Sequence, residues 1–199
     1  MPTAPQRVGR RERNKQEKLD RITAAASELF AEHGVDEVTT QQIAEKADIG
    51  TGTLFLYAKN KGELLLLVQN STYADALVEG KAAAEAAPDV LDAVMAIIRP
   101  VVACNRKQIH NGRTYLREMI FGDPAEPHHR EALGLTVQTE EAIAEVLRRD
   151  PRFGADADVL ARIVSAVMFI GLAPTINIGH SIEEILDEIE AKIKVLLHR

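Results

Sequence analysis

Apolar side chains recur along most of this sequence at intervals of three and four residues, the period of an amphipathic α-helix. The pattern is clearest from Leu19 to Phe30, and it stops at His33, just before Gly34. Glycine often lies directly after the last turn of a helix. The sequence therefore predicts a first helix that ends near His33.

The next segment carries the start signals of two short helices. Thr39 precedes Gln42 by three residues, which is the spacing of a capping box, and Val38 is placed to pack against Ile43. We predict a helix over residues 40–47, a turn at 48–50 and a third helix over 51–58. Two short helices around a tight turn form a helix-turn-helix motif, whose last helix enters the DNA major groove.

The helical period continues to the end of the chain, with further helices expected over residues 64–87, 89–109, 113–121, 127–149, 156–173 and 181–198. Pro100 is expected to kink or split its helix. Ser181 and Glu184 have capping-box spacing at the start of the last helix. No segment alternates with period two, so we predict an all-α protein of about nine helices without a sheet.

The charge of the chain is unevenly distributed. The net charge is −6, yet residues 1–21 contain seven basic and three acidic side chains. Such an arm has two interpretations, a polyanion-binding edge or a solvated tail. The single cysteine, the lack of a signal-peptide pattern and the interrupted apolar stretch at 159–178 lead us to expect a soluble, cytoplasmic protein without a membrane span.

The N-terminal motif resembles a known family. The run from Ile22 to Leu65 contains ELFAEHG at 28–34 and TTQQIAEKADIGTGTLFLYAKNKGELL at 39–65. It is similar to the DNA-binding domain of the TetR family of transcriptional regulators. The resemblance implies a basic flexible arm (1–15), a helix-turn-helix domain (16–62) and a helical ligand-binding and dimerisation domain (63–199).

The same resemblance implies which residues contact DNA: Thr39, Thr40, Gln41, Thr51, Gly52, Thr53, Phe55, Leu56, Tyr57 and Lys61. Threonine can bond a base edge or a phosphate and can meet a thymine methyl, whereas Tyr57 and Lys61 suit phosphate contacts. Many family members have Ser-Lys where this chain has Gly50-Thr51, and His-Phe where it has Tyr57-Ala58. By this comparison the chain lacks a lysine contact at position 51 and aromatic core volume at position 58.

By resemblance, the chain is expected to be a homodimeric repressor that a small molecule releases from a palindromic double-stranded operator. The alternative is a ligand-independent DNA-binding or scaffold protein. No nucleophile motif, phosphate-binding loop or metal-ligand spacing stands out, and neither the Cys104 and His110 pair nor the adjacent His128 and His129 has the spacing of a metal site. We therefore expect no enzymatic activity, metal or cofactor.

The last two helices are the predicted dimer interface. The final helix has one apolar stripe, and the helix before it is apolar on more than one face, so it needs cover on two sides. A buried monomeric core is the alternative explanation. The interface residues that we predict are Leu160, Val164, Val167, Ile182, Leu186, Ile189, Ile193 and Leu197.

A largely apolar effector pocket is expected among the middle helices, because they carry more large apolar side chains than one packed face needs. His110 or Arg117 would offer a polar anchor. An ordinary close-packed core is the alternative for each residue. The candidate lining is Met95, Ile98, Tyr115, Met119, Phe121, Val137, Met168 and Phe169.

Overall fold

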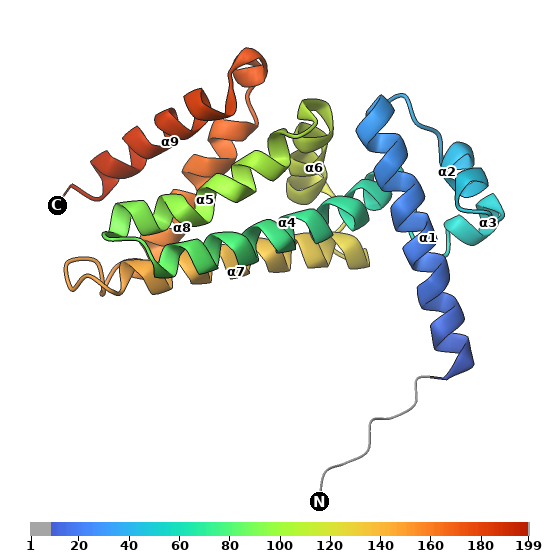
Figure 1. The fold of residues 1–199 in the computed structure, drawn as a ribbon, viewed down its shortest axis with the longest axis horizontal. Helices are drawn as coiled ribbons and strands as arrows, with labels where there is room; N and C mark the ends of the chain where they lie inside the picture. Colours follow the sequence, from blue (N-terminus) through green and yellow to red (C-terminus); the bar gives the residue numbers. More distant parts are fainter. Residues whose placement is uncertain (1–8, 199) are drawn as a thin grey trace, which may run out of the picture.

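The computed structural model describes residues 9–198. This part of the chain contains α-helices and one 3-10 helix but no strand, so the predicted all-α class is confirmed (Figure 1). The elements are α1 (Arg10–His33), α2 (Thr40–Lys46), α3 (Thr51–Leu54), α4 (Lys61–Glu85), α5 (Val90–Arg106), α6 (Ile109–Phe121), α7 (Pro127–Leu147), α8 (Ala157–Leu172), η1 (Thr175–Gly179) and α9 (Ile182–Leu196).

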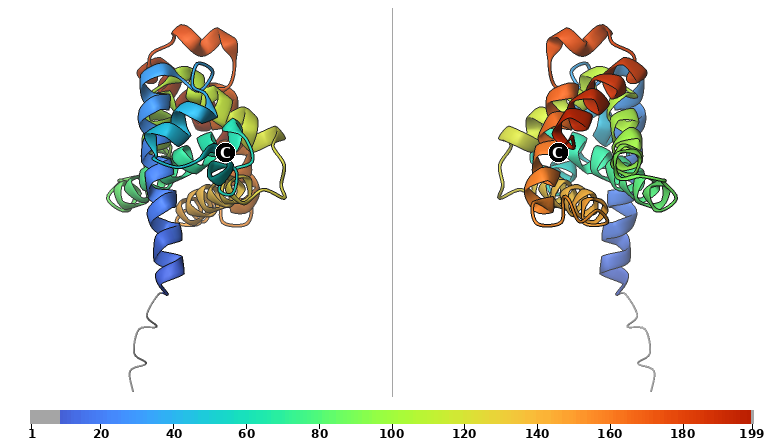
Figure 2. Two further views of the ribbon diagram at one scale, coloured as in Figure 1. Left: turned by 90° about the vertical axis from the view of Figure 1, so that its right-hand side faces the viewer. Right: turned by 90° about the vertical axis from the view of Figure 1, so that its left-hand side faces the viewer.

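The helices form a small N-terminal part, α1 to α3, and a larger body, α4 to α9. The long helix α4 contacts α1 at one end and packs along α5 and α7 in the body (Figure 1). Helix α9 packs on α5 and α8, at the side of the body remote from α2 and α3 (Figures 1 and 2). None of the described helices has the length and apolar character needed to cross a membrane.

Local signals in the sequence set several helix ends. The Thr39 side chain accepts a hydrogen bond from the N–H of Gln42, and the Gln42 side chain accepts one from the N–H of Thr39, so the predicted capping box is present. Ser181 and Glu184 form the same reciprocal pair. Gly34 follows α1 with a φ of 79°, a backbone conformation that side chains with a Cβ rarely adopt.

Three expectations about local structure need correction. Residues 10–15 of the arm that we expected to be flexible belong to α1, because the segment has no proline or internal glycine to end a helix; residues 1–8 lie outside the described residues. Helix α3 ends at Leu54 rather than at residue 58, and residues 55–57 form a turn. Pro100 lies inside α5, which runs from Val90 to Arg106 as one helix, so the split does not occur and the kink stays a prediction.

Candidate DNA interface, ligand region and dimer surface

Helices α2 and α3 are held against α1 by a small apolar core. Ile43 and Ala44 of α2 and Leu54 of α3 are all buried. The turn between the helices contains Asp48 with a φ of 52°, and the carbonyl of Gly50 accepts bonds from the N–H groups of Thr53 and Leu54. The outer faces of both short helices therefore remain free for a partner.

None of the ten predicted DNA contacts is buried. Leu56 is 83% exposed and Phe55 is 47% exposed, so both adjacent apolar side chains are accessible to a partner. No atom lies within 4 Å of the position that a Cβ would take at Gly52, so packing within the chain does not require glycine there. The remaining eight are exposed or half-buried on this end of the molecule: Thr39, Thr40, Gln41, Thr51, Gly52, Thr53, Tyr57 and Lys61.

Four of these side chains also make contacts inside the chain, the first being Thr39 in its capping box with Gln42. The Gln41 amide donates to the Glu45 carboxylate at 2.9 Å, and the Tyr57 hydroxyl donates to the carbonyl of Lys15 at 3.4 Å. The Lys61 ammonium donates to the carbonyl of Asp36 at 3.0 Å. An ammonium has three donors, so this bond leaves two for a phosphate. The DNA contact of Lys61 stays a prediction.

Asn111 on α6 joins the body to the N-terminal part, and sequence reasoning did not identify it. Its side-chain oxygen accepts a hydrogen bond from the N–H of Val35 at 2.7 Å, and its amide donates to the carbonyl of Phe30 at 2.7 Å. Asn111 is buried. In the sequence it is marked only as a polar residue on a mostly apolar face of α6.

A second junction connects α7 to the segment after α3. A ring nitrogen of His128, Nε2, lies 3.0 Å from the carbonyl oxygen of Tyr57, and Lys59 forms an ion pair with Glu126. The buried carboxyl of Glu63 lies close to this junction. Burial raises the pKa of Glu63, and the nearby His128 opposes that shift.

A hydrogen-bond chain links the second junction to the core of the body. The Tyr115 hydroxyl on α6 donates to the side-chain oxygen of Asn70 on α4 at 3.0 Å. The amide of Asn70 donates to the carbonyl of His128 at 2.9 Å, and the ring of His128 reaches Tyr57. Buried Tyr115 of α6 and Asn70 of α4 are thereby connected, through half-buried His128 of α7, to the end of the helix-turn-helix motif.

The eight residues expected to line an effector pocket occupy two kinds of environment. Phe121 is 81% exposed and Val137 is 51% exposed, so these two point out of the body, and Phe169 is half-buried. Exposure of Phe121 follows from its place as the last residue of α6. The other five are at most 3% exposed within the core: Met95, Ile98, Tyr115, Met119 and Met168. Their part in ligand binding stays a prediction.

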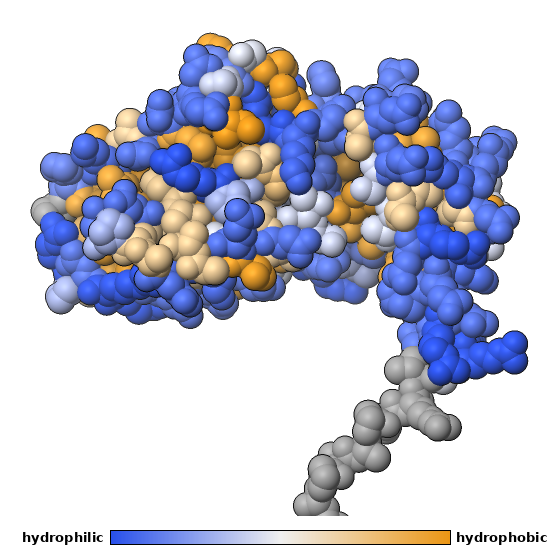
Figure 3. Space-filling view, viewed as in Figure 1, coloured by the Kyte–Doolittle hydropathy of each residue, from blue (hydrophilic) through white to orange (hydrophobic). Residues whose placement is uncertain are grey.

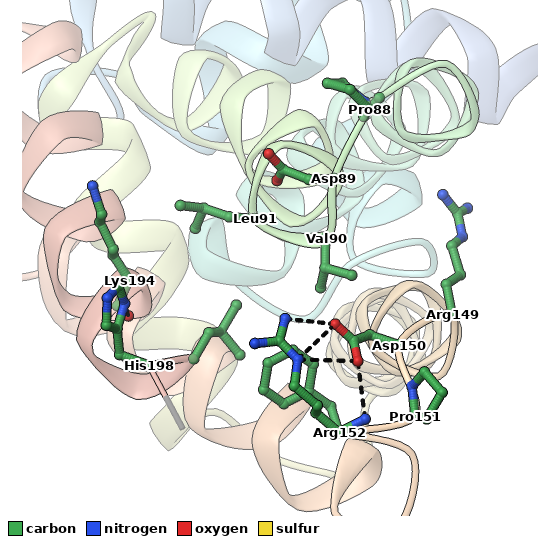
Figure 4. Close-up of a pocket in the computed structure, with 13 residues that line it drawn as sticks. Pro88, Asp89, Val90, Leu91, Arg149, Asp150, Pro151, Arg152, Lys194 and His198 are labelled. Carbon is green, nitrogen blue, oxygen red and sulfur yellow. Dashed lines mark hydrogen bonds and ion pairs between the residues drawn. The ribbon is translucent and has the colours of Figure 1, made fainter.

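A hollow of about 740 Å³ lies at the end of the body where α5 begins and α9 ends (Figure 4). Phe153 and Leu197 give it an apolar wall, and Lys194 lies on the α9 side. Arg152 donates to both carboxylate oxygens of Asp150, which lowers the pKa of Asp150. The guanidinium of Arg152 is therefore already neutralised, and this end of the body contains none of the eight predicted lining residues.

The predicted dimer residues lie mostly inside the protomer. Leu160, Val164, Leu186, Ile189 and Ile193 are buried, because α8 and α9 pack on each other and on α5 and α7. The three other predicted residues are half-buried: Val167, Ile182 and Leu197. For the five buried residues, the monomeric core is thus the better explanation of the apolar pattern.

A different apolar stripe is left uncovered on α8. Val159, Ile163, Ala166 and Ile170 are exposed and follow each other at intervals of four, three and four residues, so they share one helix face. Ile170 is 65% exposed. The sequence contained this stripe, but it gave no sign of which of the apolar faces of α8 points outward.

Comparison with known proteins gives a match for the N-terminal part. The family model described as bacterial regulatory proteins, tetR family, matches residues 22–68. Over 46 residues the chain is 37% identical to an uncharacterized HTH-type transcriptional regulator of Haemophilus influenzae. That match covers 23% of this chain and 25% of the relative, so it spans only about a quarter of the curated protein.

Solved structures resemble nearly the whole chain in fold. One is FadR of Thermus thermophilus, a TetR family transcriptional repressor in complex with lauroyl-CoA, with a TM-score of 0.72 and 21% identity over 90% of this chain and 93% of that chain. Another is FadR of Bacillus subtilis in complex with stearoyl-CoA, with a TM-score of 0.66 and 13% identity over 90% of this chain and 99% of that chain. At these identities the likeness establishes the fold.

Proposed function

We propose that the chain is a TetR-family transcriptional repressor that leaves its DNA operator when a small molecule binds, and the match of residues 22–68 to the family model supports this. The observation that carries the proposal is the α2–α3 unit, on which none of the ten predicted contact residues is buried. Exposed Phe55 and Leu56 lie beside hydroxyl-bearing Thr51 and Thr53 on α3 and its following turn. This mixture suits base edges and thymine methyl groups.

A dimer that uses the exposed stripe of α8 completes the proposal. An apolar stripe of this kind on a folded surface marks an interaction site. Two copies related by a twofold axis would place two helix-turn-helix units on half-sites about 34 Å apart, or a multiple of that distance. The operator is then a palindromic or nearly palindromic duplex.

The effector acts by changing the position of α4, α6 and α7 relative to the N-terminal part. Its chemical class is an apolar or amphipathic small molecule, which is supported by the apolar side chains of the body and by the acyl-CoA ligands of two proteins that share the fold. The hydrogen-bond chain from Tyr115 through Asn70 and His128 to Tyr57 is the route that we assign to the coupling. A ligand shifts this equilibrium only as far as it binds the two states differently.

Selection from a random duplex pool tests the DNA-binding half of the proposal. Sequencing the DNA retained by the purified protein should give a palindromic consensus, which should bind more tightly than a scrambled duplex in competition. Thr53→Ala should relax the preference at one position of each half-site, whereas Thr23→Ala, which alters a threonine of α1 bonded to its own helix, should leave the consensus unchanged. Equal binding to consensus and scrambled DNA would refute a sequence-specific repressor.

The coupling half is tested with a matched pair of tyrosine variants. Tyr115→Phe removes the hydroxyl that bonds Asn70, and Tyr73→Phe removes a hydroxyl that bonds Thr139 outside the chain of bonds. With lauroyl-CoA, stearoyl-CoA and simple apolar compounds as probes, we expect Tyr115→Phe to reduce the effector-induced change in operator affinity and Tyr73→Phe to preserve it. No response of the wild-type protein to any probe would favour the ligand-independent alternative.

A further inference from the structure

The N-terminal part of α1 extends beyond the folded body. Its first buried side chain is Ile22, so residues 10–21 carry exposed or half-buried side chains only. At 1.5 Å per residue these twelve positions correspond to about 18 Å of helix. They contain six basic and three acidic side chains, although the whole chain has a net charge of −6. Figures 1 and 2 show the helix projecting from the rest of the molecule, and Figure 3 shows its hydrophilic surface.

The basic side chains of this extension are arranged by face. Arg11, Lys15 and Lys18 follow each other at intervals of four and three residues, and Ile22 continues the same face into the core. Because Ile22 points into the body, this face of the extension turns toward α2 and α3. Arg13 lies on the opposite side of the helix.

A groove separates that face from the recognition helix. Its volume is about 720 Å³, and its α1 wall consists of Arg11, Glu12, Asn14, Lys15 and Lys18. Its other wall consists of Thr53, Leu56 and Tyr57, all of which are predicted DNA contacts. The bond from the Tyr57 hydroxyl to the carbonyl of Lys15 fixes the distance between the two walls. We call this site the α1–α3 groove.

The charges of the groove are available to a ligand. Arg11, Lys15 and Lys18 form no ion pair with any residue in the range 9–198, and Glu12 is the only acidic side chain in the described lining. Cations that form no ion pair and lie beside a helix that reads DNA favour phosphate binding, because duplex DNA carries one phosphate charge per 1.7 Å of its axis. Helix α3 has only four residues and offers few backbone contacts of its own.

We propose that the α1–α3 groove binds the phosphate backbone of the strand that borders the site read by α3, with Arg11, Lys15 and Lys18 as the phosphate-binding residues. This inference rests on the proposed function and extends it, because it assigns a second DNA-contacting element outside the helix-turn-helix motif. The extension positions the reading helix and adds affinity that is independent of base sequence. For residues 10–21 it favours the first of the two interpretations of the basic arm, a polyanion-binding edge.

The test compares two double variants with the same charge change on the same helix. Lys15→Ala/Lys18→Ala removes two charges from the groove, and Arg10→Ala/Arg13→Ala removes two charges that do not line it. Alanine is the best helix former, so α1 persists in both variants, and far-UV circular dichroism verifies this. Operator affinity is measured by fluorescence anisotropy over a range of salt concentrations.

We expect the groove variant to lower the slope of log affinity against log salt by about 1.8, which is the loss of two phosphate contacts. The control variant should change the slope by less than about half of one such contact, or about 0.5. Equal slopes for the two variants would refute phosphate binding in the α1–α3 groove and indicate only diffuse electrostatic attraction between α1 and DNA. The proposed function would be unaffected. A wild-type protein that selects no operator would instead overturn the proposed function, and the groove with it.

Discussion

Substitution of Asn111 by alanine is expected to weaken the connection between the body and the DNA-binding part. Asn111 belongs to α6, and both of its hydrogen-bond partners, Phe30 and Val35, belong to α1 or to the loop after it. All three residues are buried, so water cannot replace the missing side chain without rearrangement. The variant removes two hydrogen bonds and a small volume from the joint.

The expected loss of stability depends on which hydrogen bonds Phe30 and Val35 retain in the variant. The carbonyl of Phe30 also accepts the N–H of Gly34 at 3.0 Å, so it remains bonded in the variant. The N–H of Val35 has Asn111 as its partner, and Val35 is 2% exposed. A buried donor that loses its acceptor costs about 1–3 kcal/mol. This loss is a sizeable share of the 5–15 kcal/mol by which domains are typically stable.

Urea denaturation followed by far-UV circular dichroism measures this cost, at one fixed protein concentration because the stability of the proposed dimer would depend on concentration. The control is Asn177→Ala, which removes one buried hydrogen bond, to the carbonyl of Gly171, away from the joint. Both variants should lower the free energy of unfolding, but only Asn111→Ala should also reduce the effector response of operator binding. Asn111→Ala within about 0.5 kcal/mol of wild type would refute the reasoning, since surface substitutions have that effect.

Three further outcomes are expected. Ile163→Asp should give a folded monomer in sedimentation experiments, whereas Leu186→Asp should unfold the protomer because Leu186 is buried; an unchanged dimer in the first variant would exclude the α8 stripe. Because burial raises the pKa of Glu63, its contribution to stability falls as the pH rises above the ordinary carboxyl pKa of about 4.3, and Glu63→Gln should flatten the pH dependence of stability above that value. Gly112→Ala should lower the melting temperature, since its Cβ would lie 2.0 Å from the carbonyl oxygen of Asn105, and an unchanged melting temperature would contradict this packing.

Helix ends could be predicted where they depend on neighbours in the sequence. The Thr39 and Ser181 capping boxes need only a partner three residues away, and Gly34 needs only its own freedom to adopt a positive φ. The two short helices of the helix-turn-helix motif were predictable in a similar way, because the motif lies within residues 22–65, whereas its contacts with DNA stay a prediction. Local chemistry is sufficient for such features.

Interfaces between helices were not predictable, because they depend on which side of each helix meets a neighbour. The stripe of α9 that includes Ile189 and Ile193 is covered by α5 and α8 of the same chain, while the stripe through Ile163 is left open. Both stripes have the same period in the sequence. The partners of Asn111 are 76 and 81 residues away along the chain, so no short sequence pattern predicts that Asn111 joins the body to the N-terminal part.

The strength of the two junctions matches what an effector has to supply. Allosteric coupling between two binding sites is typically about 1–3 kcal/mol, and one intramolecular hydrogen bond contributes about 1 kcal/mol net. The junctions include the two bonds of Asn111 and the bond between His128 and Tyr57. A ligand therefore needs to disturb only two or three of these bonds to change operator affinity by the usual amount. Because α6 and α7 make these bonds, and α4 is bonded to both helices through Asn70, an effector that displaces core side chains between the three helices would act on the junctions without any movement of α9.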